Sequence, residues 1–364
     1  MTKLKNTLKN VWRVTQHFLP ELPRSRWGRR LLGGFVSLVV LIIAAMYGIA
    51  LWYQHSVSGQ QVIGASFIPA YASSLGVSPE DTLDGMLNDL HIKHLRLVSY
   101  WDQMEPQQGK YDFSQLDWQF AKAEKAGAKV SLSVGLRQPR WPECHAPSWV
   151  DTSKPAAAWQ PQLEEFIAQV ANRYKNSPAL DSYQIENEYF LQGFGICQNF
   201  DRSRLVSEFN LVKKLDPGHT AIINRSNNAL GTPINEPKAD EYGVSIYRRV
   251  WDASLTHRYL EYPEPAWFYA FMGGVHKITQ GRDLIIHEMQ AEAWSPHGTV
   301  NEISLEEQNK SLNAKRLEGR FDFARDTGLR SADMWGAEYW YYRKQVLHDP
   351  SLWDVARQQY AQQN

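Results

Sequence analysis

The stretch HLRLVSYWDQMEPQQGKYDFSQLDWQFAKAEKAGAKVSLSV, residues 94–134, decides the fold class. It opens with an apolar run near Leu95, continues with an amphipathic stretch over residues 113–126, and closes with a second apolar run near Val130. Gly127 stands where the helix would end, because glycine readily adopts the left-handed conformation found after helices. A strand, a helix and a second strand in this order predict a βαβ unit with parallel strands.

The same alternation continues along residues 62–364. Helices are expected over residues 79–90, 113–126, 159–174, 202–215, 305–324 and 352–360. Residues 227–241 (NNALGTPINEPKADE) show no clear helix, so the fifth unit is degenerate. Alternating strands and helices with eight strand positions predict an α/β fold, the (β/α)8 TIM barrel. The strand candidates begin near Val62, Leu95, Val130, Ser182, Ala221, Tyr242, Leu284 and Ser331.

An uncharged segment precedes the predicted barrel. Residues 31–53 (LLGGFVSLVVLIIAAMYGIALWY) contain no Asp, Glu, Lys or Arg, and a helix needs about 20 apolar residues to cross a bilayer. Trp27, Trp52 and Tyr53 stand where interfacial aromatic residues belong. The segment therefore predicts a single transmembrane helix, an uncleaved signal-anchor in contact with the lipid bilayer. The alternatives are a buried core helix and a cleaved signal peptide, whose apolar region is usually only about 7–15 residues long.

Charge is distributed unevenly, although the formal net charge of the whole chain is zero. Residues 1–30 contain eight Lys or Arg residues against the single acid Glu21. This bias predicts a cytoplasmic N-terminus and an extracytoplasmic barrel at the cell membrane. The predicted organisation is a basic tail over residues 1–30, a span over 31–53, a linker over 54–61 and the barrel over 62–364. Because the excess of positive charge lies in the tail, the barrel is not expected to bind nucleic acid.

Two predicted strand ends contain a carboxylate, and catalytic side chains of such barrels come from strand ends. The fourth strand reads YQIENEY over residues 183–189, and the seventh reads LIIHEMQ over residues 284–290. Glycoside hydrolysis needs two carboxyl groups on opposite sides of the anomeric carbon. Glu188 and Glu288 are therefore the catalytic candidates. Glu186, which shares a strand face with Glu188, and Glu292 are the alternatives, and ordinary rim ion pairs are the non-catalytic interpretation.

The order of these motifs resembles that of the clan A, or four-seven, retaining glycoside hydrolases. Residues 95–149 and the text QIENEY are similar to the β-galactosidase family typified by thermophilic bacterial enzymes. The matching positions are the strand-two Arg96, the strand-four pair Asn187 and Glu188, the strand-seven Glu288, and the strand-eight Trp335. The resemblance implies a double displacement with Glu188 as acid/base and Glu288 as nucleophile.

The resemblance also implies roles for the neighbouring residues. Arg96 would support the ionised nucleophile, Tyr247 would donate a hydrogen bond to it, and Asn187 would bind a sugar 2-hydroxyl. Trp335 would form a platform for the sugar ring. The text HEMQAEAW over residues 287–294 differs from that family's usual strand-seven sequence, so the resemblance implies the mechanism and leaves the sugar open.

Further loop residues are expected near a carbohydrate site. Trp101 and Trp294 are predicted to line it, because flat indole faces suit the apolar C–H faces of sugars. Cys144 and Cys197 follow neighbouring strands in a compartment where disulfides persist, so a bridge between them is one possibility and free thiols are the other. The sequence contains no HExxH, GxGxxG or P-loop motif, so no metal, cofactor or nucleotide is expected.

The sequence thus predicts a membrane-anchored retaining glycoside hydrolase. Its substrate would be an extracytoplasmic oligosaccharide, polysaccharide or glycoconjugate with an O-glycosidic bond. A transglycosidase that uses the same covalent intermediate and a non-catalytic sugar-binding barrel are the two alternatives.

Overall fold

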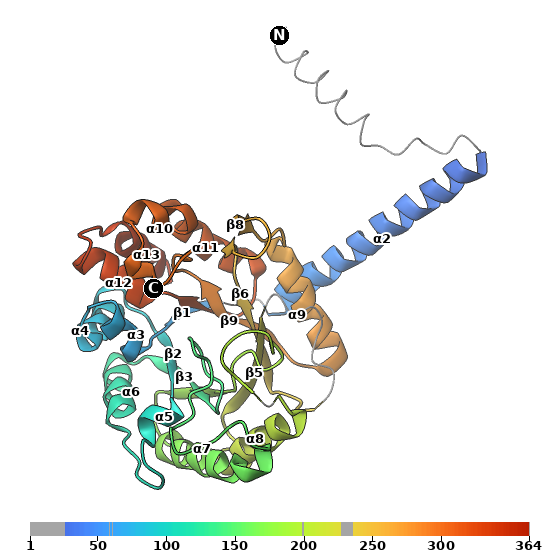
Figure 1. The fold of residues 1–364 in the computed structure, drawn as a ribbon. Helices are drawn as coiled ribbons and strands as arrows, with labels where there is room; N and C mark the ends of the chain where they lie inside the picture. The colour runs from blue at the N-terminus through green and yellow to red at the C-terminus, as the bar shows by residue number, and fades with distance from the viewer. Residues whose placement is uncertain (1–25, 58, 60, 199, 227–235, 364) are drawn as a thin grey trace. The chain divides into compact units, whose positions relative to one another are not determined.

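The computed structural model describes residues 26–57, 59, 61–198, 200–226 and 236–363. The chain divides into two compact units, Met1–Ile49 and Ala50–Asn364. The second unit is a closed barrel of parallel strands surrounded by helices (Figure 1). This architecture confirms the predicted (β/α)8 TIM barrel.

In the described residues, eight strands close the barrel in the order β1-β10-β9-β6-β5-β4-β3-β2. They are almost entirely buried, because side chains fill the interior and helices cover the outer face. Each strand begins within two residues of its predicted start. The strands are β1 (Val62–Ser66), β2 (His94–Val98), β3 (Lys129–Val134), β4 (Leu180–Ile185), β5 (Thr220–Ser226), β6 (Glu241–Ile246), β9 (Leu284–Gln290) and β10 (Ser331–Trp335).

The helices lie mainly in the connections between strands, as the predicted βα units require. The longer ones are α4 (Pro79–Asp84), which continues as the π-helix η1 (Gly85–Asp89), α6 (Ser114–Ala126), α7 (Gln160–Tyr174), α8 (Arg202–Leu215), α9 (Ala266–Gln280), α10 (Leu305–Ser311), α11 (Ala314–Thr327), α12 (Ala337–Gln345) and α13 (Ser351–Ala361). Short helices are α3 (Pro69–Ser74), α5 (Trp101–Met104), η2 (Ala156–Ala158) and η3 (Val300–Glu302).

Several elements differ from the prediction. The helix expected over residues 305–324 is two helices, because Asn313 begins a new one: its Oδ1 accepts a hydrogen bond from the Arg316 backbone N–H at 3.0 Å. Helix α9 was not predicted, and neither was the antiparallel hairpin of β7 (Arg249–Asp252) and β8 (Arg258–Glu261). The degenerate fifth connection falls largely on residues 227–235, which lie outside the described residues.

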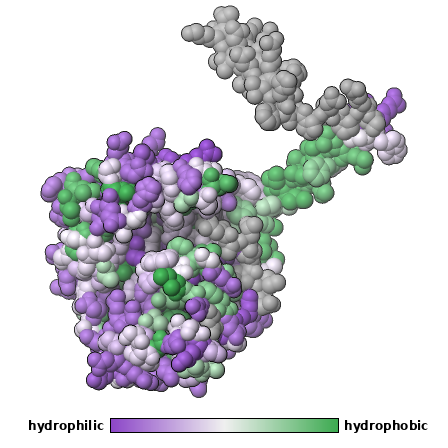
Figure 2. Space-filling view, viewed as in Figure 1, coloured by the Kyte–Doolittle hydropathy of each residue, from purple (hydrophilic) through white to green (hydrophobic). Residues whose placement is uncertain are grey.

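Helix α2 (Arg26–Ser56) contains the predicted span and extends beyond it at both ends. Of the helices in the described part of the chain, it alone is long and apolar enough to cross a bilayer, a property that a signal sequence shares. Its side chains are mostly exposed, which rules out a buried core helix. Figure 2 shows the apolar surface that they form. The basic tail lies mostly outside the described residues.

The last residues of α2 belong to the barrel unit. Tyr53 is fully buried, and its hydroxyl accepts a hydrogen bond from the Leu284 backbone N–H at 3.0 Å. Gln54 Nε2 donates to the backbone carbonyls of Asp326 and Thr327. The predicted boundary is therefore wrong: Tyr53 is part of the folded domain, and residues 54–56 of the expected linker are helical.

Candidate active site

A cleft of about 340 Å³ lies where the barrel strands end. Side chains that follow β3, β4 and β6 line it, together with residues at the ends of β5, β9 and β10. The cleft brings together most of the side chains singled out from the sequence, with Arg96 directly beneath them. Those that line it are Asn187, Glu188, Tyr247, Glu288, Trp294 and Trp335.

Glu288 lies on β9 and is held by two donors. Arg96 Nη1 donates to Glu288 Oε2 at 2.6 Å, and the Tyr247 hydroxyl donates to Oε1. Burial, followed by the charges of Glu288 and Glu188, raises the pKa of Tyr247 well above its usual value, so its hydroxyl keeps its proton. A cation and a hydroxyl donor are thus directed at the two oxygens of one carboxyl group. Glu288 thus has the environment that a carboxylate nucleophile requires.

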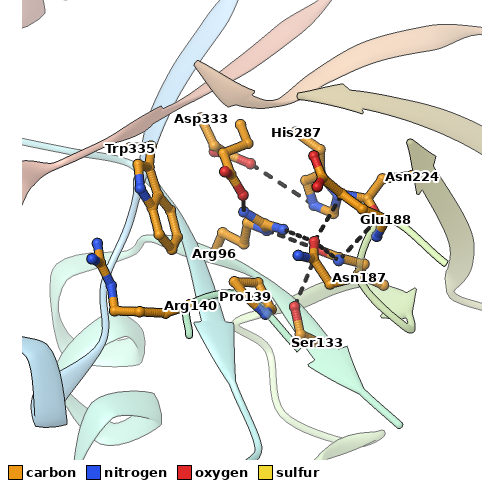
Figure 3. A network of polar contacts seen from close by, with 12 residues as sticks. Arg96, Ser133, Pro139, Arg140, Asn187, Glu188, Asn224, His287, Asp333 and Trp335 are labelled. Atoms are coloured by element: carbon orange, nitrogen blue, oxygen red, sulfur yellow. Dashed lines mark hydrogen bonds and ion pairs between the residues drawn. The ribbon is translucent and has the colours of Figure 1, made fainter. Parts of the chain in front are cut away.

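Arg96 is itself fixed within the barrel. Its Nε donates to Gln184 Oε1 at 2.8 Å, and its Nη2 donates to Asn187 Oδ1 at 2.9 Å. Figure 3 shows the guanidinium group between Trp335 and Asn187. Because this buried guanidinium group donates to three acceptors, its orientation is fixed. It therefore also fixes the positions of the Glu288 and Asn187 side chains relative to each other.

The chain leaves strand geometry just before Glu188. β4 ends at Ile185, and Glu186 and Glu188 have left-handed backbone angles of φ 58° and 43°. Glu186 accepts hydrogen bonds from the backbone N–H groups of Leu136 and Arg137 and forms an ion pair with Arg204 at 2.8 Å. The expectation that both glutamates share a strand face is wrong, and only Glu188 lines the cleft.

Glu188 is buried, and its environment opposes ionisation. Burial raises its pKa to about 8, and the negative charges of Glu288 and Glu143 act in the same direction. Within the described residues, Glu188 Oε1 has no hydrogen-bond partner. Its backbone N–H donates to Asn224 Oδ1 at 2.8 Å, which fixes its place in the loop. Burial and the two neighbouring carboxyl groups therefore favour the protonated form of Glu188, which is the form that a general acid needs.

Glu143 is a third carboxyl group of this cleft that was not singled out from the sequence. Its Oε2 accepts a hydrogen bond from Asn187 Nδ2 at 3.0 Å, and burial raises its pKa. Glu143 follows β3 in a loop of left-handed and turn conformations (φ 73° at Glu143 itself). Periodicity does not determine the direction of a side chain in such a loop, so this contact could not be predicted from the sequence.

Glu292, the alternative on the seventh strand, has other partners. It pairs with Arg140 at 3.1 Å and accepts a hydrogen bond from Trp335 Nε1 at 2.9 Å. The Arg140 guanidinium group lies between two rings, 3.3 Å from the centroid of Tyr71 and 4.4 Å from that of Trp335. These contacts make Glu292 and Arg140 parts of the cleft wall. Neither Arg140 nor Tyr71 was identified from the sequence.

The two tryptophans predicted from loop position have different surroundings. Trp294 lines the cleft, with its ring edge-to-face against Tyr247 at 5.7 Å. Trp101 is fully buried, packs against Trp149 and Phe166, and donates from Nε1 to Glu105 at 2.7 Å. The short helix α5 directs its side chain into the core. The prediction that Trp101 lines the cleft is wrong.

Cys144 and Cys197 are joined in a disulfide with an S–S distance of 2.05 Å. The bond connects the loops that follow β3 and β4, and both loops line the cleft.

Across the described ranges, no group of three or more His, Cys, Asp or Glu side chains is arranged to hold a metal ion. The cleft itself presents carboxyl groups, with Arg96 and Tyr247 bound to one of them.

Comparisons with known proteins find similarity to glycoside hydrolases. A family model described as beta-galactosidase, glycoside hydrolase family 42, matches residues 80–159. Beta-galactosidase BbgII from Bifidobacterium bifidum is 26% identical over an alignment that covers 34% of this chain and 20% of that protein. The chain therefore spans about a fifth of the length of this curated relative.

Solved structures share the fold. The polyextremophilic beta-galactosidase from the Antarctic haloarchaeon Halorubrum lacusprofundi is 13% identical, with a TM-score of 0.53 over 83% of this chain and 58% of that chain. The native xylanase 10B from Thermotoga maritima is 14% identical, with a TM-score of 0.51 over 83% of this chain and 97% of that chain. The fold, the site and the family match support a clan A retaining glycosidase. Part of the barrel is similar in sequence to the beta-galactosidase family.

Proposed function

We propose that this protein is a membrane-anchored retaining glycoside hydrolase in which Glu288 is the nucleophile and Glu188 the acid/base. The observation that supports it is the contrast between two carboxyl groups in one cleft. Glu288 is bound by Arg96 and Tyr247, whereas Glu188 is buried with a raised pKa. A retaining reaction starts from this combination of one ionised and one protonated carboxyl group.

In the first step, Glu288 attacks the anomeric carbon and Glu188 gives its proton to the leaving oxygen. The glycosidic bond breaks, and a glycosyl group is joined to Glu288. In the second step, Glu188 takes a proton from water, whose oxygen attacks the anomeric carbon and releases Glu288. Arg96 and Tyr247 stabilise the departing carboxylate, and Asn187 hydrogen-bonds the sugar 2-hydroxyl.

The proposed substrate is an extracytoplasmic oligosaccharide, polysaccharide or glycoconjugate. Trp335 and Trp294 present aromatic surface in the cleft for the apolar faces of a sugar. The exposed apolar surface of α2 and the basic residues before it support a single span with a cytoplasmic N-terminus.

Replacing the acid and supplying an external nucleophile tests the role of Glu188. We expect Glu188→Ala to lower kcat/KM about 10²- to 10⁴-fold on a substrate with a poor leaving group. On a 2,4-dinitrophenyl glycoside, whose first step needs no acid, azide should raise the turnover of Glu188→Ala and yield a glycosyl azide with the configuration of the substrate, because a small anion that fits the space left by the carboxyl group attacks the glycosyl-enzyme. Glu318→Gln, on the exposed face of α11, is the matched control.

Full activity in Glu188→Ala, or a loss that azide does not rescue, would contradict this role. If the wild type turns over no glycoside yet still binds sugar, the non-catalytic sugar-binding barrel becomes the better description. Products formed only when an acceptor sugar is added would indicate a transglycosidase.

A further inference from the structure

Exposed apolar side chains gather on one wall of the cleft. Trp141 is 59% exposed, Phe194 41% and Ile196 67%. The rings of Trp141 and Phe194 both line the cleft, 6.1 Å apart and nearly perpendicular. Single exposed apolar residues are ordinary, whereas a cluster beside a cleft is typical of a binding surface.

The two loops that form this wall are fixed to each other. The disulfide between Cys144 and Cys197 joins them, and the Ile196 backbone N–H donates to the Pro142 carbonyl at 2.9 Å. Arg137 Nη1 donates to the carbonyl of Phe194 at 2.8 Å. The wall is thus shaped before a ligand arrives, which lowers the entropy lost on binding.

The wall stands beside the proposed acid. Phe194 is on the loop that follows Glu188, and between them Leu191 also lines the cleft, with its backbone N–H donating to the Glu188 carbonyl at 2.8 Å. A general acid must lie next to the oxygen that it protonates. The group attached to that oxygen therefore lies on this side of the cleft.

The charges nearby restrict the kind of ring that this wall can accept. Glu143, Glu188 and Glu292 all line the cleft, and the cation Arg140 is already paired with Glu292. Among the described residues that line the cleft, the one cation is Arg140, so an anionic sugar would have to compete with Glu292 for it, whereas the C–H face of an uncharged pyranose packs well on an indole ring.

We propose, resting on the function proposed above, that Trp141 and Phe194 form the leaving-group subsite and that it takes an uncharged sugar ring. The disulfide between Cys144 and Cys197 is its positioning device. In the reverse direction, the same wall holds an acceptor sugar against the glycosyl-enzyme. The acceptor oxygen then bonds to the anomeric carbon, the bond to Glu288 breaks, and the hydroxyl proton passes to Glu188.

The test begins with the full-length chain in detergent. The protein is trapped with 2,4-dinitrophenyl 2-deoxy-2-fluoro-β-glycosides of galactose, glucose, mannose and xylose, and freed of excess reagent. Recovery of activity is then followed in buffer alone, with 4-nitrophenyl β-D-glucopyranoside, and with the matched anionic 4-nitrophenyl β-D-glucuronide.

We expect the glucopyranoside to accelerate recovery saturably and the glucuronide to do so far less. In Trp141→Ala, the ratio of acceptor-driven to water-driven recovery should fall roughly tenfold, the loss of about 1.4 kcal/mol of ring stacking. The double variant Cys144→Ser, Cys197→Ser should change in the same direction. Ile278→Ala, which removes a 60% exposed apolar side chain from α9, is the control and should match the wild type.

If trapped Trp141→Ala recovers its activity at the same acceptor-to-water ratio as the trapped wild type, the proposed subsite is wrong. The proposed function would stand, because both proteins were labelled. Equal acceleration by the glucuronide would overturn the assignment to an uncharged ring. No label from any of the four reagents would overturn the proposed function together with this subsite.

Discussion

At the level of single residues, four carboxyl groups line the cleft, those of Glu143, Glu188, Glu288 and Glu292. Glu143 lies beside the proposed acid/base and binds Asn187, whose Oδ1 in turn accepts a hydrogen bond from Arg96. Its negative charge opposes the ionisation of Glu188 and so adds to the effect of burial on the pKa of Glu188. Glu143 therefore acts on the reaction through its neighbour, as a positioning residue.

The raised pKa of Glu188 predicts how kcat/KM changes at alkaline pH. Because the pKa of Glu188 is raised to about 8, the acid form is present below that pH, and kcat/KM should fall as pH rises through it. Glu143→Gln removes a negative neighbour, lowers the pKa of Glu188, and should move this limb to lower pH. Glu318→Gln should leave the limb in place. An unchanged limb in Glu143→Gln would contradict the electrostatic role of Glu143.

Tyr247 offers a second test at this scale. Its hydroxyl donates to Glu288, and a hydrogen bond to a charged group is worth about 1.5–3 kcal/mol. We expect Tyr247→Phe to lower kcat/KM roughly 10- to 150-fold, with the circular dichroism spectrum unchanged. Tyr174→Phe is the matched control, since that hydroxyl donates to Asp117 Oδ1 at 2.8 Å, away from the cleft. Activity within twofold of the wild type in Tyr247→Phe would show that this contact is not used in the reaction.

Motif order was enough to predict which strand-end residues meet in the cleft. Glu188, Glu288, Arg96 and Asn187 are all on strands or directly after them, where position in the chain determines position in space. Arg140 and Glu143 were missed because they lie in an irregular loop, with left-handed φ angles of 83° and 73°. Trp101 was misplaced for a related reason: a four-residue helix turns its side chain inward.

At the scale of elements, the end of α2 is part of the barrel. The Tyr53 ring packs so closely on α9 that a Cβ at Gly273 would lie 2.3 Å from Tyr53 Cε1. Gly273 is therefore required for this approach. The Tyr53 hydroxyl donates to Asp283 Oδ1 and accepts a hydrogen bond from the Leu284 backbone N–H at the start of β9. The helix that enters from the predicted span thus ends as a packed element of the catalytic domain.

Truncating this side chain should destabilise the barrel. Replacement of a fully buried aromatic ring by alanine costs about 3–5 kcal/mol, so Tyr53→Ala in the full chain should unfold at clearly lower denaturant concentration. Trp52→Ala, which removes a 47% exposed ring from the adjacent position, should have a much smaller effect. Equal stabilities of the two variants, measured by urea unfolding in detergent, would show that the packing contributes little.

Strands were easier to predict than helices in this chain. Every barrel strand is a short apolar run bounded by polar or turn residues, which gives a clear signal. Helix α9 contains the adjacent glycines Gly273 and Gly274 and four aromatic residues, all of low helix propensity, so its composition does not mark it as a helix. The division between α10 and α11 depends on one asparagine cap, a local feature that a long amphipathic pattern conceals.

On the scale of the whole molecule, the role of α2 decides where the enzyme works. We expect the full chain to stay with the membrane fraction after alkaline carbonate washing and to be released by detergent, with its N-terminus intact by mass spectrometry. Residues 31–49 alone are about long enough to cross a bilayer. A soluble product that lacks these residues would show instead that the segment is a cleaved signal peptide.

In the proposed reaction, Glu288 forms a covalent bond with the sugar, and Glu188 donates and then accepts the proton. Labelling the full chain with the panel of 2-fluoro glycosides, followed by digestion and peptide mass spectrometry, tests it most directly. We predict a single glycosylated peptide that contains the sequence LIIHEMQ, with the sugar on Glu288 and no label in Glu288→Gln. A label on Glu292 or on any other residue would contradict this account.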